Sequence, residues 1–226
     1  RYTSHFTERL HIVDNTHPPL RMQVVVAPVQ SPSDSKAFID LPWEIYRNNT
    51  HWVPQLRGEQ KKRFDKSTYP FFDHAAVEFF IARQNGCAVG RIAAIKDDSH
   101  IDFHEEPAGF FGFFECIESQ DVAAALFSHA ADWLKNQKLE VMRGPMSYST
   151  NDECGLLIDG FDSSPVIMMP YNPPYYLSLI EGFGFKTAKD LLAYEITDAV
   201  PVPDRLAKIV ERTKTRKKIV IRQLEK

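Results

Sequence analysis

A pair of long apolar segments joined by a two-residue turn constrains this chain more than any other feature. The segments AVEFFIARQ and CAVGRIAAI, residues 76–84 and 87–95, are rich in strand-forming residues and flank Asn85-Gly86. An Asn-Gly pair is favoured between strands because both turn positions need a positive φ, which these two residues adopt at little cost. The sequence therefore predicts a β-hairpin near the middle of the chain.

The order of the remaining elements places the chain in the α/β class. Runs rich in β-branched and aromatic residues alternate with stretches whose apolar residues recur every three or four positions. The predicted order is β-α-α-β-β-β-α-β-β-α-β, with an antiparallel start and a crossover connection in the second half. Besides the hairpin, strands are expected at 23–30, 110–117, 140–147, 164–170 and 191–197, helices at 31–47 (interrupted at Pro42), 52–64, 121–138 and 172–183, and loops at 66–74, 96–109 and 149–163.

Composition divides the chain into three segments. Residues 1–21 show no periodicity and are predicted to be an irregular extension before a domain at 22–198. The segment 199–226 is basic, although the whole chain has a net charge of −3. Its Ile209 and Val210 follow Leu206 by three and four positions, which predicts a helix with one apolar stripe and a solvated basic face.

The ends of the sequence indicate a fragment. The chain begins with Arg and ends within the apolar pattern IVIRQLEK, without a polar tail. We therefore expect the basic segment to lead toward a second domain.

Several classes of protein are disfavoured. The three cysteines, Cys87, Cys116 and Cys154, form no CxxC pair and lie far apart, which argues against a disulfide framework or structural zinc and favours a reducing compartment. No apolar run approaches the ~20 residues that a membrane span needs, and no signal sequence is evident. No aromatic residue interleaves the basic segment, so nucleic-acid binding is not expected. The sequence predicts a cytoplasmic protein without a metal.

The order and wording of the segments resemble the GNAT superfamily of acyl-CoA-dependent N-acyltransferases, over 22–197. The resemblance is carried by IARQNGCAVGRIAAI, by FFGFFECI with the helix after it, and by Asn172 followed by LSLIEGFGF. It implies a mixed, mostly antiparallel sheet with splayed central strands, flanked by helices. More narrowly, WEIYRNNTHWVP, PFFDHA, RGPMS, GLLIDGF and YNPPYY resemble a bacterial group with two GNAT-like halves, which implies a second GNAT-like domain, or a homodimer, as partner.

The resemblance also implies where acyl-coenzyme A would bind. In this family, backbone groups of a splayed strand pair with the pantetheine arm, and the next helix directs its N-terminus at the pyrophosphate, where free amides and the helix dipole favour anions. In this sequence the corresponding residues are Phe114, Cys116, Ser119, Gln120, Asp121, Val122 and Asn172. The family's loop glycines are missing, since the segment reads Glu118-Ser-Gln-Asp-Val-Ala. Ser119 as a helix cap, with Asp121 complementing the dipole, is the simpler explanation of these residues.

The catalytic residues are less clear from the sequence. The family's proton-donating tyrosine aligns with Ile180, or with Leu179 in the neighbouring register, whereas Tyr176 lies one turn earlier on the same helix face. Glu115, charged within an apolar strand, and Glu153 are the candidate bases. Tyr148, Asn151 and Asp152, just past a strand end, are candidates to bind the acceptor amine, a small molecule or a lipid, or else to form a solvated loop.

The sequence is therefore consistent with two functions. One is transfer of an acyl group from a coenzyme A thioester to an amine. The other is a GNAT-like half that has lost its chemistry and serves as a structural or substrate-binding domain for a catalytic half. The missing glycines and tyrosine favour the second, and the polar loop at the strand end favours the first. Because one fold hosts many activities, geometry at residues 113–119 is what separates them.

Overall fold

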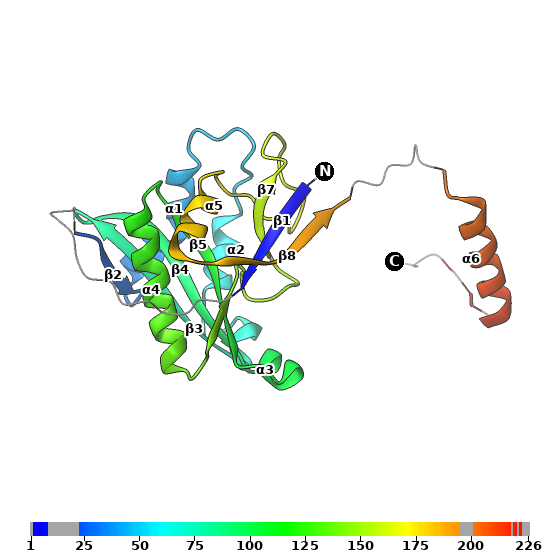
Figure 1. The fold of residues 1–226 in the computed structure, drawn as a ribbon, viewed down its shortest axis with the longest axis horizontal. Helices are drawn as coiled ribbons and strands as arrows, with labels where there is room; N and C mark the ends of the chain where they lie inside the picture. Colours follow the sequence, from blue (N-terminus) through cyan, green and yellow to red (C-terminus); the bar gives the residue numbers. More distant parts are fainter. Residues whose placement is uncertain (1, 9–22, 195–200, 218, 221, 223–226) are drawn as a thin grey trace. The chain divides into compact units, whose positions relative to one another are not determined.

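The computed structural model describes residues 2–8, 23–194, 201–217, 219–220 and 222. They fall into two units, Arg1–Ala193 and Tyr194–Lys226. The first contains a five-stranded sheet in the order β2-β3-β4-β5-β6 (Figure 1). Its strands are β2 Val25–Pro28, β3 Ala75–Gln84, β4 Cys87–Asp97, β5 Ala108–Cys116 and β6 Val141–Arg143, antiparallel except for the parallel pair β5 and β6.

The predicted hairpin forms the centre of this sheet. Strands β3 and β4 are joined at Asn85 and Gly86, whose φ angles are 50° and 81°. Strand β5 pairs with β4 on the other side and is buried along nearly its whole length, because both faces of the sheet are covered. The α/β class and the mixed, mostly antiparallel sheet predicted from the sequence are confirmed.

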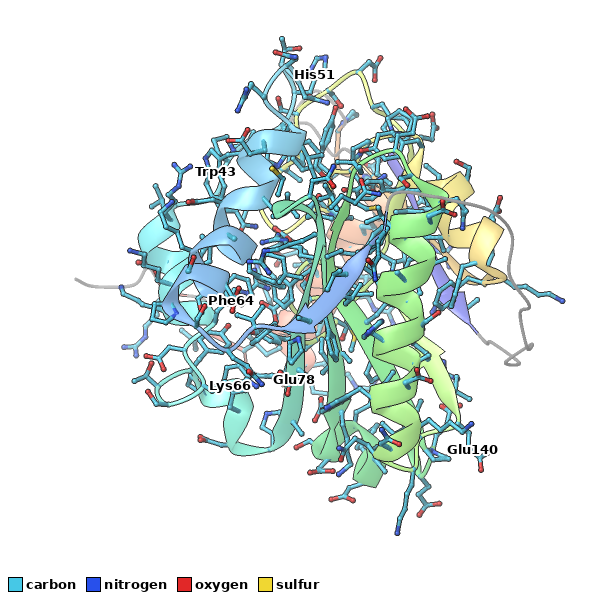
Figure 2. The ribbon with its side chains drawn as sticks, turned by 90° about the vertical axis from the view of Figure 1, so that its left-hand side faces the viewer. Trp43, His51, Phe64, Lys66, Glu78 and Glu140 are labelled. Atoms are coloured by element: carbon cyan, nitrogen blue, oxygen red, sulfur yellow. The ribbon has the colours of Figure 1, made fainter. Side chains whose placement is uncertain are left out.

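Helices cover both faces of the sheet. Figure 2 shows α1 Pro32–Ile45 and α4 Gln120–Asn136 on opposite sides of it. The α4 face holds one apolar cluster, to which α5 Tyr176–Phe183 contributes. The α1 face holds a second cluster, rich in phenylalanine, next to α2 Arg57–Arg63 and the 3-10 helix Pro70–Asp73.

The start of α1 follows from its local sequence. Ser31 and Asp34 form a capping box, and Pro32 stands in the first turn, where its missing N–H costs nothing. Pro42 does not interrupt the helix as expected, and α1 continues to Ile45. Pro42 lies in the last turn, where its own carbonyl still accepts the N–H of Tyr46.

A second sheet contains elements that the sequence placed wrongly. It has the order β7-β1-β8, both pairs antiparallel, with β1 Tyr2–Glu8, β7 Leu156–Asp159 and β8 Lys186–Ala193. Residues 2–8 are therefore a strand and not part of an irregular extension, because two strands from distant parts of the chain pair with them. The rest of the predicted extension, 9–21, lies outside the described residues.

Two further predictions of local structure were wrong. Residues 164–170 were expected to be a strand, but they form an exposed loop bracketed by Pro165 and Pro170, with Ile167 92% exposed. The strand lies earlier, at β7, where Leu156 and Leu157 are buried. The polar stretch 96–109 contains a short helix, α3 Asp98–His104, capped by the Asp97 carboxylate.

The second unit contains α6 Asp204–Lys217. It confirms the helix predicted from the spacing of Leu206, Ile209 and Val210, which are about half exposed. A membrane-spanning helix would need more length and more apolar residues than any helix in the described ranges has.

Candidate functional site

Strands β5 and β6 are paired for only a short distance before they separate. Their parallel register covers Ala108–Phe110, and beyond it the Met146 N–H donates to the Phe111 carbonyl at 2.8 Å, a backbone-to-backbone bond. The backbones approach closely at Gly112, where an added Cβ would lie 2.1 Å from the Met146 carbonyl oxygen. This close approach makes Gly112 the pivot from which the two segments diverge.

A bulge bends β5 at the point of divergence. The pairing of β4 with β5 shifts register between Arg91 and Ala93, and Phe113 has a φ of 50°. The Phe113 N–H donates to the Ser147 hydroxyl at 3.3 Å, which fixes the bulge to the neighbouring segment. Because a bulge redirects a strand and its side chains, the last residues of β5 face an opening. The predicted splay of the central strands is confirmed.

Two small cavities meet at this opening. The wedge cavity, of about 70 Å³, lies between the end of β5 and the segment that follows β6, and Phe114, Tyr176 and Asn172 help to line it. The α1 cavity, of about 80 Å³, lies toward α1 and the chain at 52–60. Both are lined by Arg91, Phe113, Glu115, Glu153 and Tyr171. Each has room for a reacting group and a few waters.

Glu115 occupies the boundary between the cavities. Its side chain is 13% exposed, Tyr176 donates its hydroxyl to Oε2 at 2.8 Å, and Arg91 Nη2 lies 3.7 Å from Oε1. Burial raises the pKa of Glu115 to about 7, although Arg91 and the hydroxyls of Tyr176 and Tyr46 favour the ionised form. A carboxyl group that titrates near neutrality can both take up and release a proton under ordinary conditions.

Arg91 is the counter-charge of Glu115 and is itself buried. Its guanidinium donates to the Phe38 carbonyl at 2.7 Å and lies over the Phe38 ring, and the residue is 6% exposed. Burial lowers the pKa of Arg91, and the nearby Glu115 opposes that shift. Within the described residues its Nε–H has no hydrogen-bond partner. The sequence analysis did not single out Arg91, although a lone cation in the apolar strand VGRIAAI marks it.

Glu153 is the second carboxylate of the site. Gln55 donates to its Oε1, and burial raises its pKa while Arg63 and Arg91 counteract the shift. Its neighbour Asp152 is engaged differently, because it accepts from Arg63 at 3.0 Å. The predicted base Glu153 therefore lies in the cavity wall, whereas Asp152 is held in an ion pair. Gln55 was not foreseen.

The two tyrosines at the start of α5 bind the end of β5. The Cys116 N–H donates to the Tyr176 hydroxyl at 2.8 Å, and the Tyr175 hydroxyl donates to the Cys116 carbonyl at 2.8 Å. Both backbone groups of Cys116, predicted to pair with the pantetheine arm, are therefore already bonded. Tyr176 is 1% exposed, and burial together with Glu115 raises its pKa well above the ordinary value, so the hydroxyl stays protonated.

The start of α4 differs in part from the predicted anion site. Ser119 is at the N-cap position, but its side chain makes no capping bond, so the expected cap is wrong in this detail. The Gln120 amide is engaged with the Leu179 carbonyl, and Val122 is fully buried against the position of Gly90. Asp121 lies in the first turn, as predicted, and complements the helix dipole.

Three other candidate residues have structural contacts. Tyr148 is fully buried in the α1-face cluster and donates its hydroxyl to the Arg63 carbonyl, which holds it out of both cavities. Asn151 is exposed in the turn that Ser149 stabilises. Asn172 lines the wedge cavity, but its amide bonds both backbone groups of Leu157 and so fastens β7. The structure does not bring Tyr148 and Asn151 to the site because local packing and turn bonds engage them.

The raised pKa of Glu115 leads to a prediction about stability. Because the folded state holds this proton more tightly than the unfolded chain, whose pKa is about 4.5, the associated stability is lost as the pH rises through about 7. The free energy of unfolding of the native chain, relative to Glu115→Gln, should fall by about 3 kcal/mol as the pH rises from about 4.5 to about 7. Urea denaturation at several pH values measures the difference, with the exposed Glu118→Gln as control. Parallel curves for the native chain and Glu115→Gln would show that Glu115 titrates normally.

The fold and site together define a class of protein: an α/β domain with a buried carboxylate–tyrosine pair where two parallel strands separate. In the described part of the chain, no group of three or more His, Cys, Asp or Glu residues is arranged to hold a metal ion. No protein-family model matches the chain.

Two curated proteins are similar in sequence. Protein YghO from Escherichia coli is 38% identical over 192 residues, 84% of this chain and 48% of the relative. A bacterial ceramide synthase from Caulobacter vibrioides is 33% identical over 207 residues, 88% of this chain and 52% of the relative. The chain thus spans about half the length of both curated relatives.

Two solved structures were also found. A tandem GNAT protein from the clavulanic acid biosynthesis pathway has a TM-score of 0.40 at 14% identity, covering 51% of this chain and 34% of its own. A GCN5-related N-acetyltransferase from Kribbella flavida has a TM-score of 0.36 at 12% identity, covering 62% and 47%. Both are GNAT proteins, the superfamily that the sequence resembles.

Proposed function

We propose that this domain takes part in N-acyl transfer, moving an acyl group from a coenzyme A thioester to an amine. The observation that carries the proposal is the pairing of Glu115 with Tyr176 at the bulged end of β5. The two groups differ in pKa, since Glu115 titrates near neutrality and Tyr176 stays protonated. Acyl transfer to an amine needs both an acceptor for the amine proton and a donor for the leaving thiolate.

The proposed steps assign one proton transfer to each residue. Glu115 accepts a proton from the amine as the nitrogen forms its bond to the thioester carbon. Tyr176 donates its hydroxyl proton to the sulfur as the carbon–sulfur bond breaks. Glu115 then returns its proton to Tyr176 across their 2.8 Å hydrogen bond. The products are an amide and a free thiol, and both residues regain their starting states.

The return of a proton from Glu115 to Tyr176, called the relay below, explains how a tyrosine with a raised pKa can serve as the donor. Giving up its proton alone would leave a phenolate beside a carboxylate. When Glu115 is already protonated, however, the proton passes in effect from a group with a pKa of about 7 to a more basic thiolate. The Cys116 N–H, which already donates to the Tyr176 oxygen, stabilises the transient negative charge.

The available space fits the reacting end of a thioester. The wedge cavity, at about 70 Å³, has room for the thioester group only, so the rest of coenzyme A would extend toward the N-terminus of α4. There the backbone amides after Ser119 favour anions, while Asp121 opposes them. Because Cys116 is already bonded, binding at that residue would require Tyr175 and Tyr176 to be displaced.

One of the two curated relatives supports an amide product, because it is named a bacterial ceramide synthase and a ceramide is an amide. The chain spans about half of that relative. We therefore propose that a second domain completes the working enzyme, and the resemblance noted from the sequence implies that this domain is GNAT-like. A cytoplasmic location and the use of acyl-coenzyme A remain parts of this proposal.

The variant Tyr176→Phe tests the donor. We expect the rate of acyl transfer to fall by about 10²-fold, because the donor and the relay are both lost. The loss should be smallest for thioesters whose thiol has a low pKa, since such a leaving group needs no proton. Thiol release with a thiol-reactive dye measures the rate. A fall that is equal for all leaving groups would argue that Tyr176 has only a structural role.

Calorimetric titration of the chain with coenzyme A and acyl-coenzyme A separates the proposal from its alternative. Binding of acyl-coenzyme A that Tyr176→Phe preserves supports a catalytic domain. Absence of binding by this chain would favour the alternative, a structural or substrate-binding half whose cofactor site has been lost.

A further inference from the structure

A wide apolar groove opens beside the α1 cavity. Its volume is about 690 Å³, and its walls are the chain at 53–56 and the loop at 165–169. Apolar side chains on both walls are exposed to water: Val53 by 55%, Leu56 by 75%, Val166 by 73%, Ile167 by 92% and Met168 by 56%. Exposed apolar side chains gathered on facing walls mark a site for an apolar ligand more often than an ordinary surface.

The groove is continuous with the charged site on one side only. Gln55, Gln60 and Glu153 line both the groove and the α1 cavity. Among the residues that line the wedge cavity, in contrast, only Glu153 also lines the groove. Glu153 therefore stands between the place proposed for the thioester and the groove. A chain bound in the groove belongs to the other substrate, the amine.

Glu153 supplies the complement to a cationic head group. Its hydrogen-bond donor is the uncharged Gln55, and in the described part of the chain it makes no direct ion pair. The neighbouring Asp152 is already neutralised by Arg63. A carboxylate at the inner end of an apolar groove matches a primary ammonium attached to an alkyl chain.

We infer that the groove and Glu153 form the binding site of the acceptor, an alkyl chain that carries a primary amine. The ammonium binds at Glu153 and Gln55, and it loses one proton to water before the neutral amine attacks beside the proposed base Glu115. The alkyl chain lies between the walls at 53–56 and 165–169. Ile167, the most exposed apolar residue of the groove, determines the preference for long chains. This inference rests on the proposed function, because it assigns the second substrate of the same site.

Calorimetry with the whole chain and three simple probes tests the inference. Octylammonium should bind more tightly than propylammonium, which lacks the chain, and more tightly than octanol, which lacks the charge. Glu153→Gln should weaken octylammonium about tenfold and leave octanol unchanged. Ile167→Ser should weaken octylammonium about tenfold and leave propylammonium unchanged. The matched controls are Glu118→Gln and Leu192→Ser, at exposed positions outside the groove.

Specific outcomes overturn the inference. If octylammonium does not bind, or binds equally well to both variants, the site is not the acceptor site. If Ile167→Ser weakens octanoyl-coenzyme A but not octylammonium, the groove holds the acyl chain instead. The titrations with octylammonium and propylammonium contain no thioester. They can therefore contradict the acceptor site without bearing on acyl transfer itself. Amine binding without any transfer would contradict only the proposed function.

Discussion

Replacing Glu115 by Gln should reduce the rate of acyl transfer by about 10²- to 10⁴-fold, the range for loss of a general base. Gln keeps the size of the side chain, and its carbonyl oxygen can still accept the Tyr176 hydroxyl, so the local contacts change little. It cannot accept the amine proton or return one to Tyr176. Steady-state kinetics with acyl-coenzyme A and an alkylamine measures the effect.

The pH profile separates a catalytic Glu115 from a structural one. In the native chain kcat/KM should fall below a pH of about 7, as Glu115 becomes protonated. This limb should be absent in Glu115→Gln, whose residual activity does not depend on that group. Glu140→Gln, at an exposed position beyond the C-terminal end of α4, is the matched control and should behave like the native chain. A limb that survives in Glu115→Gln would assign the titration to another group.

Substitution of Gly112 by Ala should strongly destabilise the first unit. The new Cβ would lie 2.1 Å from the Met146 carbonyl oxygen and 2.7 Å from its carbon, and backbone atoms cannot move aside as a flexible side chain can. We expect a loss of about 3 kcal/mol, or a fall in Tm of about 10 °C. Thermal unfolding followed by circular dichroism measures it.

Gly58→Ala is the matched control for this experiment. Gly58 lies in α2, and a Cβ there meets nothing within 4 Å. Because Ala is the better helix former, this variant should be about 0.5 kcal/mol more stable than the native chain. Equal stability of Gly112→Ala and the native chain would mean that β5 and the segment after β6 are not as close as described.

The core of the fold could be predicted because its signals are local. Asn85-Gly86 specifies its own turn, and the apolar runs of β3, β4 and β5 are long enough to be recognised without their partners. In contrast, β1 is a strand because β7 and β8 pair with it, and no local pattern reports such partners. The loop at 164–170 has the composition of a strand, but its prolines have no N–H to donate to a ladder.

The candidate site could be predicted only in part, for the same reason. Glu115 and Tyr176 were proposed separately, one from a charge in an apolar strand and one from helix spacing, and the fold brings them to 2.8 Å. Arg91 and Gln55 were missed because their roles depend on strand pairing and on a distant loop. Tyr148 was misplaced because the residue next to a strand end can turn inward as readily as outward. Its φ of 85° directs it into the core.

The most direct test of acyl transfer at this site is whether the chain forms an amide. Incubated with an acyl-coenzyme A and octylamine, the native chain should produce N-acyl octylamine and free coenzyme A in equal amounts, as detected by mass spectrometry. Glu115→Gln should produce about 10²-fold less or lower still. Equal yields from the native chain and Glu115→Gln, or a native chain that forms no amide and binds no acyl-coenzyme A, would contradict the assignment of acyl transfer to this site.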